Sequence, residues 1–460
     1  MTNTSAAPSP LVNRLGVAGY GLIAVGALVA AVAWPLDHAA LGFLGRWVAL
    51  IGTVLYAVRR RSLTAWILVA MLIGAEIGHD WPAAGQSARL LSQIFLRLIK
   101  TIIGPLLFAT LVVGIAGHSN LRQVGRMGLK SLVYFEVVTT IALFLGLAAI
   151  NLSRAGVGVT PPAQLTPAGV TGVKQTAAEA ILNAFPENIA KAVAEGHVLQ
   201  IVVFSILFGI GLALVTESKR QPVLAFCEGL AEVMFKFTKL VMYFAPIGVG
   251  AAIAYTVGHM GLGILVNLFK LLATLYVALI AFLLFVLLPV ALFVRVPLRK
   301  FVRAIAEPVS IAFATTSSEA ALPLAMQRME EFGVPRKIVA FVMPTGYSFN
   351  LDGSTLYLAL ASVFVAQAAG IHLTFGHQLG IVFTLMLTSK GVAGVPRATL
   401  VILLGTAASF GLPEWPILAI LGIDELMDMA RTSVNVIGNC LATVVVARWE
   451  GEFKDAPAPS

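Results

Sequence analysis

The last long apolar segment, residues 415–448, constrains the fold of this chain most strongly. Polar residues recur in it at steps of three or four, which places them on one face of a helix. They are Asp424, Asp428, Arg431, Asn435 and Asn439, with Thr432 beside Arg431. The segment is long enough to cross a bilayer. In lipid, such a face has to line a cavity, meet a ligand or join a buried ion-pair network between helices.

Composition supports a chain that crosses the membrane many times. Hydrophobic residues make up 58% and charged residues only 12%, a balance that leaves a soluble protein too little polar surface. The net charge is +9, but the basic residues cluster between apolar segments, as cytoplasmic loops require. We therefore expect contact with lipid and no nucleic-acid partner. Cys227 and Cys440 lie in apolar stretches, which favours packing roles over a disulfide framework.

Further apolar runs predict the other membrane helices, and the basic clusters between them all fall on one side. The runs are residues 15–33, 43–58, 66–77, 94–116, 132–152, 198–214, 224–257 and 265–294. The run 224–257 is too long for a perpendicular span, so we expect it to be tilted or broken near Pro246. The loop 153–196 is predicted to be external, and both termini are predicted to be cytoplasmic.

Three later apolar segments are interrupted by polar residues, at 315–319, 348–354 and 388–397. The first lies between two basic clusters, so it starts and ends on the same side and is re-entrant. The resulting order is hairpin then long helix, twice, entered from opposite sides. That is the layout of an inverted repeat, in which broken helices mark a binding site at mid-membrane.

Four motifs in this half resemble the dicarboxylate/amino acid:cation symporter family, which includes bacterial proton/sodium-glutamate symporters and excitatory amino acid transporters. The motifs are Ser317-Ser318-Glu319-Ala-Ala-Leu-Pro323, Asn350-Leu351-Asp352-Gly353-Ser354, Gly391-Val-Ala-Gly394-Val395-Pro396 and Asp428-Met-Ala-Arg431-Thr432-Ser-Val-Asn435. The similarity covers roughly residues 64–452. It implies an all-α polytopic membrane protein with a glutamate-transporter-like fold: inverted repeats, two re-entrant helical hairpins and broken helices.

The resemblance also implies a homotrimer in which each protomer has a scaffold and a transport domain that moves like an elevator. We assign residues 63–296 mainly to the scaffold and trimerisation helices, with part of the transport domain. Residues 297–452 form the core of the transport domain. Residues 1–62 are an extra region with two apolar helices, without an assigned function, and 453–460 are a C-terminal tail.

The resemblance places the substrate between the two hairpin tips and the last helix. Ser317, Ser318 and the backbone of the first tip would bind a carboxylate, helped by the positive end of a half-helix; the alternative is a simple turn. By the same resemblance, Asp428 takes the substrate ammonium, and Arg431 takes the side-chain carboxylate with Ser354 and Thr432. Asn435 holds the backbone end. The resemblance also implies that the second tip, residues 392–399, is the extracellular gate and that its Gly394, Val395 and Pro396 contact the substrate.

The stretch from Asn350 to Gly353 predicts an unwound helix whose carbonyl, amide and carboxylate oxygens suit Na⁺, although the same residues can form a plain turn. The resemblance assigns its cation sites to ten positions. They are Ser348, Asn350, Leu351 through its carbonyl, Asp352, Ser389, Val392, Asn435, Asn439, Thr139 and Thr140. Apart from the coupling ions, no cofactor is expected.

Departures from the family pattern bear on the gate and the coupling ion. Arg397 and Thr399 stand where family members commonly have glycine. Asn439 stands where sodium-coupled members often have aspartate, which removes one charge from a cation site. Glu136 and Glu319 are membrane acids that could carry a proton, since burial raises the pKa of a carboxyl group. For Glu136 the alternative is a structural acid with satisfied contacts.

The predicted function is a secondary active symporter that imports glutamate or aspartate with H⁺ and/or Na⁺, in a bacterial inner membrane. A C4-dicarboxylate symporter is the nearest alternative, but a dicarboxylate has no ammonium to meet Asp428. A membrane enzyme or sensor is the alternative from another class. Against it, the sequence shows no nucleophile–base pair, phosphate loop or appended soluble domain.

Overall fold

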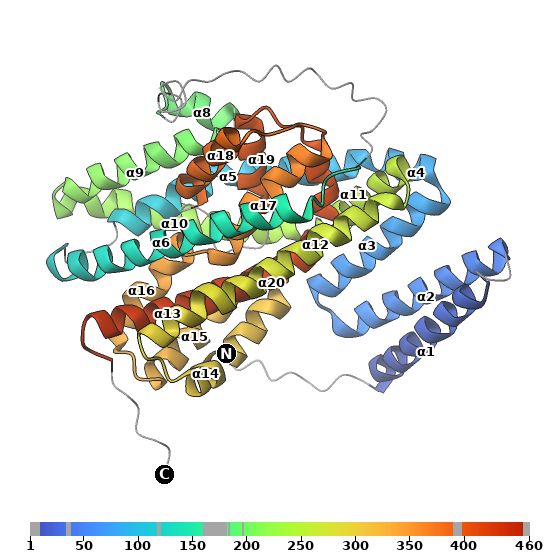
Figure 1. Cartoon of the computed structure of the whole chain (residues 1–460), viewed down its shortest axis with the longest axis horizontal. Helices are drawn as coiled ribbons and strands as arrows, with labels where there is room; N and C mark the ends of the chain where they lie inside the picture. Colours follow the sequence, from blue (N-terminus) through green and yellow to red (C-terminus); the bar gives the residue numbers. More distant parts are fainter. Residues whose placement is uncertain are drawn as a thin grey trace, which may run out of the picture. The chain divides into compact units, whose positions relative to one another are not determined.

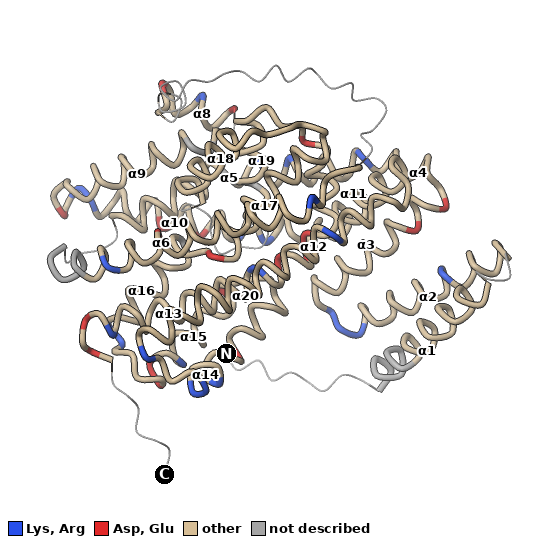
Figure 2. The backbone as a smooth tube through the Cα atoms, in the orientation of Figure 1, with Lys and Arg blue, Asp and Glu red and all other residues tan. Residues whose placement is uncertain are grey.

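The computed structural model describes residues 10–33, 38–116, 121–159, 182, 185–195, 197–389 and 398–453, and the regular elements among these residues are all helices (Figure 1). By length and composition, seven of its helices can cross a membrane, or up to eight if the pair α10 and α11 forms one span. Most of the chain in Figure 2 is free of charge, and most blue and red segments lie at helix ends and connections. The prediction of an all-α, multi-pass membrane protein is confirmed.

The chain divides by packing into two compact units, which we describe separately. Unit 1 comprises residues 1–95 and 243–262, and unit 2 comprises 96–242 and 263–460. This division says nothing about relative motion, so the scaffold and transport domains remain predictions.

Unit 1 is built of closely packed helices. They are α1 (Pro10–Ala33), α2 (Ala39–Arg60), α3 (Leu63–Asp80), α4 (Pro82–Ser87), the first turns of α5 (Arg89–Ala116), and α11 (Ala245–Met260). Helices α3 and α11 pack backbone to backbone: a Cβ at Gly74 would lie 2.1 Å from the carbonyl oxygen of Gly250. Small residues allow this approach, as in other membrane helix pairs.

Unit 2 begins with the rest of α5 and continues through α6 (Leu121–Ser153), α8 (Ile189–Glu195), α9 (Val198–Leu214) and α10 (Glu217–Met242). The long apolar run 224–257 is broken, as predicted, and the break lies at Tyr243 and Phe244, just before Pro246 rather than at Pro246 itself. Pro246 instead lies in the first turn of α11, where its missing N–H costs nothing.

The next apolar run is one continuous helical segment: α12 (Gly263–Phe282), the π-helical turn η1 (Leu283–Leu287) and α13 (Leu288–Phe293). The π-turn ends two residues before Pro289, whose ring cannot fit a regular α-helical hydrogen-bond ladder.

The last part of unit 2 follows the predicted order of hairpin and long helix, twice. The first hairpin is α14 (Leu298–Thr315) and α15 (Ser318–Glu331), followed by α16 (Arg336–Phe349) and α17 (Asp352–Ala368). The second is α18 (Phe375–Thr388) and α19 (Ala398–Ser409), followed by α20 (Trp415–Trp449). Helix α20 packs against α14, α15, α16, α17 and α12, so it forms the centre of this unit.

Candidate functional site

Helix α20 carries most of the candidate site and is buried along nearly its whole length. Pro416 lies in its first turn, where proline is compatible with a helix. Asp424, Asp428, Arg431, Asn435 and Asn439 are each at most 4% exposed. The polar face predicted from spacing therefore points into the protein, where every charge needs a partner.

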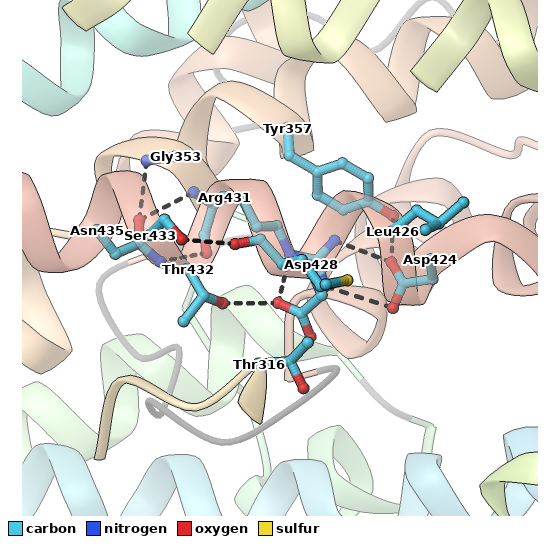
Figure 3. Close-up of polar contacts among 12 residues, drawn as sticks. Thr316, Gly353, Tyr357, Asp424, Leu426, Asp428, Arg431, Thr432, Ser433 and Asn435 are labelled. Atoms are coloured by element: carbon cyan, nitrogen blue, oxygen red, sulfur yellow. Dashed lines mark hydrogen bonds and ion pairs between the residues drawn. The ribbon is translucent and has the colours of Figure 1, made fainter. Parts of the chain in front are cut away.

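Arg431 is the largest of the side chains that are completely buried. Its Nη1 lies 2.9 Å from Asp424 Oδ1, and its Nη2 lies 3.4 Å from Asp424 Oδ2. Its Nε donates to Asp428 Oδ1 at 3.0 Å. The guanidinium also lies over the ring of Tyr357, 4.3 Å from the ring centre. Figure 3 shows Arg431 between the two acids, with Tyr357 across from it. The guanidinium is thus held by two charges and one aromatic face.

Tyr357 comes from α17 and adds a second contact to the same cluster. Its hydroxyl donates to Asp424 Oδ1 at 3.3 Å. Asp424 is completely buried, and its two oxygens bind both the tyrosine and the arginine. These contacts fix the plane of the guanidinium, so they determine where an incoming carboxylate could meet it.

Asp428 is the acid expected to meet an ammonium group. Its Oδ1 accepts hydrogen bonds from Arg431 Nε and, at 2.9 Å, from Thr432 Oγ1. Figure 3 shows Thr316 of the first hairpin tip on the side of α20 where Asp428 and Thr432 lie. The structure therefore brings Asp428, Arg431 and Thr432 together, as the sequence predicted, and adds Asp424 and Tyr357.

The first hairpin turns at Thr316, within the interruption predicted at 315–319. Thr316 has a φ of 50° and ends α14 in the left-handed region. Ser317 then caps α15, because its Oγ accepts from the backbone N–H of Ala320 at 3.3 Å. Ser318 is 2% exposed, and Glu319 is half-buried in the first turn of α15. The tip therefore presents the N-terminus of a half-helix inside the protein.

The break between α16 and α17 is organised by Asn435 of α20. Asn435 Oδ1 accepts from the N–H groups of Gly353 and Ser354, at 2.8 and 3.2 Å. Asn435 Nδ2 donates to Ser354 Oγ at 2.9 Å. These contacts satisfy the N–H groups that begin α17. Gly353 is required for the approach, since a Cβ there would lie 2.4 Å from the carbonyl oxygen of Arg431. Ser354 and Asn435, both predicted substrate residues, are thus adjacent.

A second buried cluster contains Asn350, Asp352 and Asn439, each completely buried. Asn350 Nδ2 makes only long contacts, 3.4 Å to Asp352 Oδ2 and 3.4 Å to Asn439 Oδ1. Among the described residues, Asn350 Oδ1 and Asn439 Nδ2 have no hydrogen-bond partner. A Cβ at Gly438 would lie 2.0 Å from Asp352 Oδ2. Oxygens gathered this closely, and only partly satisfied, suit a hard cation.

Other predicted cation ligands lie outside this cluster or already make hydrogen bonds of their own. The carbonyl oxygen of Leu351 accepts from both the N–H and the hydroxyl of Thr355, each at 2.8 Å, so a cation there would compete with two donors. Thr139 is buried on α6, and its hydroxyl donates to the Phe135 carbonyl at 2.6 Å. Thr140 and Glu136 are half-buried on the same helix, which packs against α16, α17 and α20.

The second tip lies mainly outside the described residues. Ser389 ends α18 and is buried, and no partner of its Oγ is found in the part of the chain that the structure describes. Val392, Gly394, Val395 and Pro396, together with the side chain of Ser348 and the departure at Arg397, lie outside the described residues. Their predicted roles in the gate and cation sites remain predictions.

Spacing alone did not assign roles to Asp424, Tyr357 or Gly438. Asp424 was part of the polar face, and its distance of seven residues from Arg431 signals two turns of one helix. Tyr357 lies five residues after Asp352, the first residue of α17, among apolar neighbours that give no sign of a polar role. Gly438 gives no sequence signal for its contact, because the neighbouring carboxylate comes from another helix.

Broken helices that meet at a buried site of paired charges and backbone amides define a membrane transporter of small charged solutes. The chain matches the profile of the sodium:dicarboxylate symporter family over residues 63–449, and it belongs to that family. It is thus a cation-coupled symporter, and the family recognised from the four motifs is confirmed.

Relatives of known name fall into two substrate groups. The chain is 41% identical over 407 residues to the proton/sodium-glutamate symport protein of Bacillus subtilis (strain 168), covering 86% of this chain and 95% of that protein. It is 41% identical over 411 residues to the proton/glutamate-aspartate symporter of Escherichia coli (strain K12), covering 85% and 94%. It is 42% identical over 405 residues to the C4-dicarboxylate transport protein of Anaeromyxobacter sp. (strain K), covering 86% and 92%.

Proposed function

We propose that this symporter imports acidic amino acids, glutamate or aspartate. The observation that carries the proposal is the pairing of Arg431 with Asp428 on one buried helix face, 3.0 Å apart. A guanidinium matches the planar fork of a side-chain carboxylate, and a carboxylate accepts from an ammonium group. A substrate with two acids and one amine would satisfy both residues. The glutamate and glutamate-aspartate symporters among its relatives support the same substrate class.

A C4-dicarboxylate is the second candidate substrate, because relatives named for that transport are equally similar. Such a substrate brings no ammonium to Asp428, so this buried acid would gain no positive partner beyond its present contact with Arg431. Competition decides between the two. We expect unlabelled glutamate and aspartate to suppress uptake of labelled glutamate into proteoliposomes, and succinate and malate to do so weakly. Uptake of labelled succinate that glutamate does not suppress would reverse the assignment.

For the coupling ion, we propose protons at least in part, with a sodium site at Asn350, Asp352 and Asn435. Asn439 contributes an amide and no charge to that region, which weakens the hold on a bound cation. Glu136 and Glu319 are half-buried acids of α6 and α15, and we propose them as proton carriers.

Imposed gradients separate the two ions. Proteoliposomes without sodium but with an inward proton gradient should accumulate substrate, and a protonophore should abolish the accumulation. Glu136→Gln should reduce it. Strict dependence on external Na⁺, without any response to the proton gradient, would contradict proton coupling.

The assembly is proposed to follow the family layout: a homotrimer in the bacterial inner membrane, with both termini cytoplasmic. Residues 63–296 would supply mainly the scaffold and 297–452 the core of a moving transport domain. Mass measurement of the intact protein in mild detergent tests the trimer, and labelling of cysteines introduced near the termini tests their side.

A further inference from the structure

The hairpin of α1 and α2 lies before residue 63, where the match to the family begins. Its two helices form one closely packed piece. Glycines spaced seven residues apart on each helix face each other, Gly19 against Gly52 and Gly26 against Gly45. A Cβ at Gly26 would lie 2.4 Å from the backbone nitrogen of Ala49. Backbones in such contact move together, so the hairpin behaves as a unit.

One arginine of this hairpin reaches two acids of the next helix. Arg46 of α2 donates through Nε to Glu76 and, at 2.8 Å, through Nη2 to Asp80 Oδ1. Trp47 Nε1 donates to the other oxygen of Asp80 at 2.8 Å. Glu76 and Asp80 are four residues apart, on one face of α3, and their side chains are only 15% and 9% exposed. The two acids are thus largely covered on the face where α2 meets α3.

Apolar contacts support this interface at both ends of α2. Near the acids, the ring centres of Trp47 and Trp81 are 5.2 Å apart, and Phe43 lies 6.0 Å from Trp81. At the other end, Ala57 packs with Ala65 and Val69 of α3. Aromatic rings beside charged groups are typical of membrane helices near the water interface.

The contact between α2 and α3 also neutralises charge. Helix α3 is apolar enough to count as a membrane span, yet it carries Glu76 and Asp80 on one face. Acids on a membrane helix are costly unless a positive group pairs with them. Arg46 provides that group from the part of the chain that precedes the family match.

We propose that Glu76 and Asp80 of α3, with Trp81 directly after its end, form the docking surface for the hairpin of α1 and α2, and that Arg46 is its required counter-charge. The hairpin and the first helix of the family region then depend on each other for stability. The cluster holds helices together and takes no part in moving substrate. This proposal is independent of which substrate or ion the symporter uses.

A double-substitution cycle in the full-length protein tests the pairing. Arg46→Met should lower the melting temperature of the purified protein by several degrees, because it leaves two acids without their partner. In a Glu76→Gln/Asp80→Asn background, the same substitution should have little further effect. Arg59→Met, on the same helix, is the matched control and should change the melting temperature little in either background.

An equal loss from Arg46→Met in both backgrounds, or no loss in either, would overturn the proposal. If Arg46→Met gives no folded protein, the triple variant decides. Recovery of folded protein when both acids are also neutralised supports the counter-charge, and failure to recover it contradicts the proposal. Glutamate uptake per folded transporter should match the wild type in every variant that folds. A specific loss of uptake at unchanged melting temperature would show that the cluster serves transport.

Discussion

The two polar clusters along α20 differ in how completely their polar atoms find hydrogen-bond or ion-pair partners within the cluster. Around Arg431, the shortest contacts to Asp424 and Asp428 are 2.9 and 3.0 Å long, a second contact to Asp424 is 3.4 Å long, and an aromatic ring covers the guanidinium. Around Asn350, the side-chain contacts are 3.4 Å long, and two buried amide atoms have no partner among the described residues. In the first cluster, two acids already hold the guanidinium, so a ligand has to share Arg431 with them. The second can bind one by gaining contacts that it lacks.

This difference predicts different consequences for the two kinds of ligand. A substrate carboxylate has to compete with Asp424 for Arg431, so the net gain in free energy is smaller than the contact itself would suggest. A cation near Asp352 and Asn350 would meet side chains whose present hydrogen bonds are long, so it would displace weaker contacts. The substrate cluster therefore supplies selectivity through matched charge, and the cation cluster supplies affinity.

Arg431→Cys should have the largest effect, because it removes the only positive charge of the first cluster. We expect a loss on the order of 2–5 kcal/mol in glutamate binding, the cost of leaving a buried carboxylate without its partner. Preference should shift toward neutral amino acids. Uptake of labelled glutamate and of a neutral amino acid into proteoliposomes measures both effects. Arg448→Cys, near the end of the same helix, controls for expression, and unchanged glutamate uptake in Arg431→Cys would refute the assignment.

Gly438→Ala should come next, and it probes the second cluster alone. Its Cβ would lie 2.0 Å from Asp352 Oδ2, so the carboxylate would have to move, at a cost of about 1–3 kcal/mol. We expect the dependence of uptake on cation concentration to shift to higher concentrations, with substrate selectivity unchanged.

Gly229→Ala is the matched control for this prediction, since a Cβ there meets nothing within 4 Å. It should leave the cation dependence as in the wild type. A change in selectivity between glutamate and dicarboxylates in Gly438→Ala would mean that the two clusters do not act separately.

Asp428→Asn should have an effect of similar size that is more selective among substrates. The amide keeps the shape of the side chain but loses the charge that an ammonium group would meet, a difference of about 1–3 kcal/mol. Binding of glutamate should weaken more than binding of succinate or malate, measured by competition in one preparation. Equal weakening of all three would argue that Asp428 only positions Arg431.

Tyr357→Phe should have the smallest effect. It removes a 3.3 Å hydrogen bond to Asp424 but keeps the ring beneath Arg431, so we expect about 0.5–1 kcal/mol. The affinity for glutamate should fall slightly at an unchanged order of substrates. Tyr357→Leu, which also removes the aromatic face, should cost more. If Tyr357→Phe costs as much as Tyr357→Leu, the hydroxyl and not the ring supports the arginine.

The sequence predicted those features that depend on the residues of a single helix. The polar face of α20 and the breaks at Thr316 and Asn350 are in the structure where the sequence placed them, because each follows from local spacing or from a polar run in an apolar segment. The identity of the partners was not predictable in this way. Tyr357, Gly438 and Arg46 meet groups from other helices, and such contacts depend on tertiary packing.

The break in the run 224–257 shows the same limit at the level of the backbone. Proline suggested a break near Pro246, but Pro246 fits the first turn of α11, and the chain breaks at the two residues before that helix. The carbonyl of Leu351 is a second example of this limit. The unwound stretch was predicted to leave it free, but it accepts two hydrogen bonds from Thr355.

Helix α20 runs unbroken past Asp424, Asp428 and Arg431, and this bears on the rate of transport. Asp424 and Arg431 are seven residues apart, which is about 10 Å along one rigid helix. Arg431 can therefore leave Asp424 for a ligand by turning about its own side-chain bonds, without bending the backbone. Side-chain rotation is far faster than the microsecond-to-millisecond motions of domains. The exchange of partners at Arg431 should therefore not limit turnover, which leaves the larger movements of the protein to set the pace of transport.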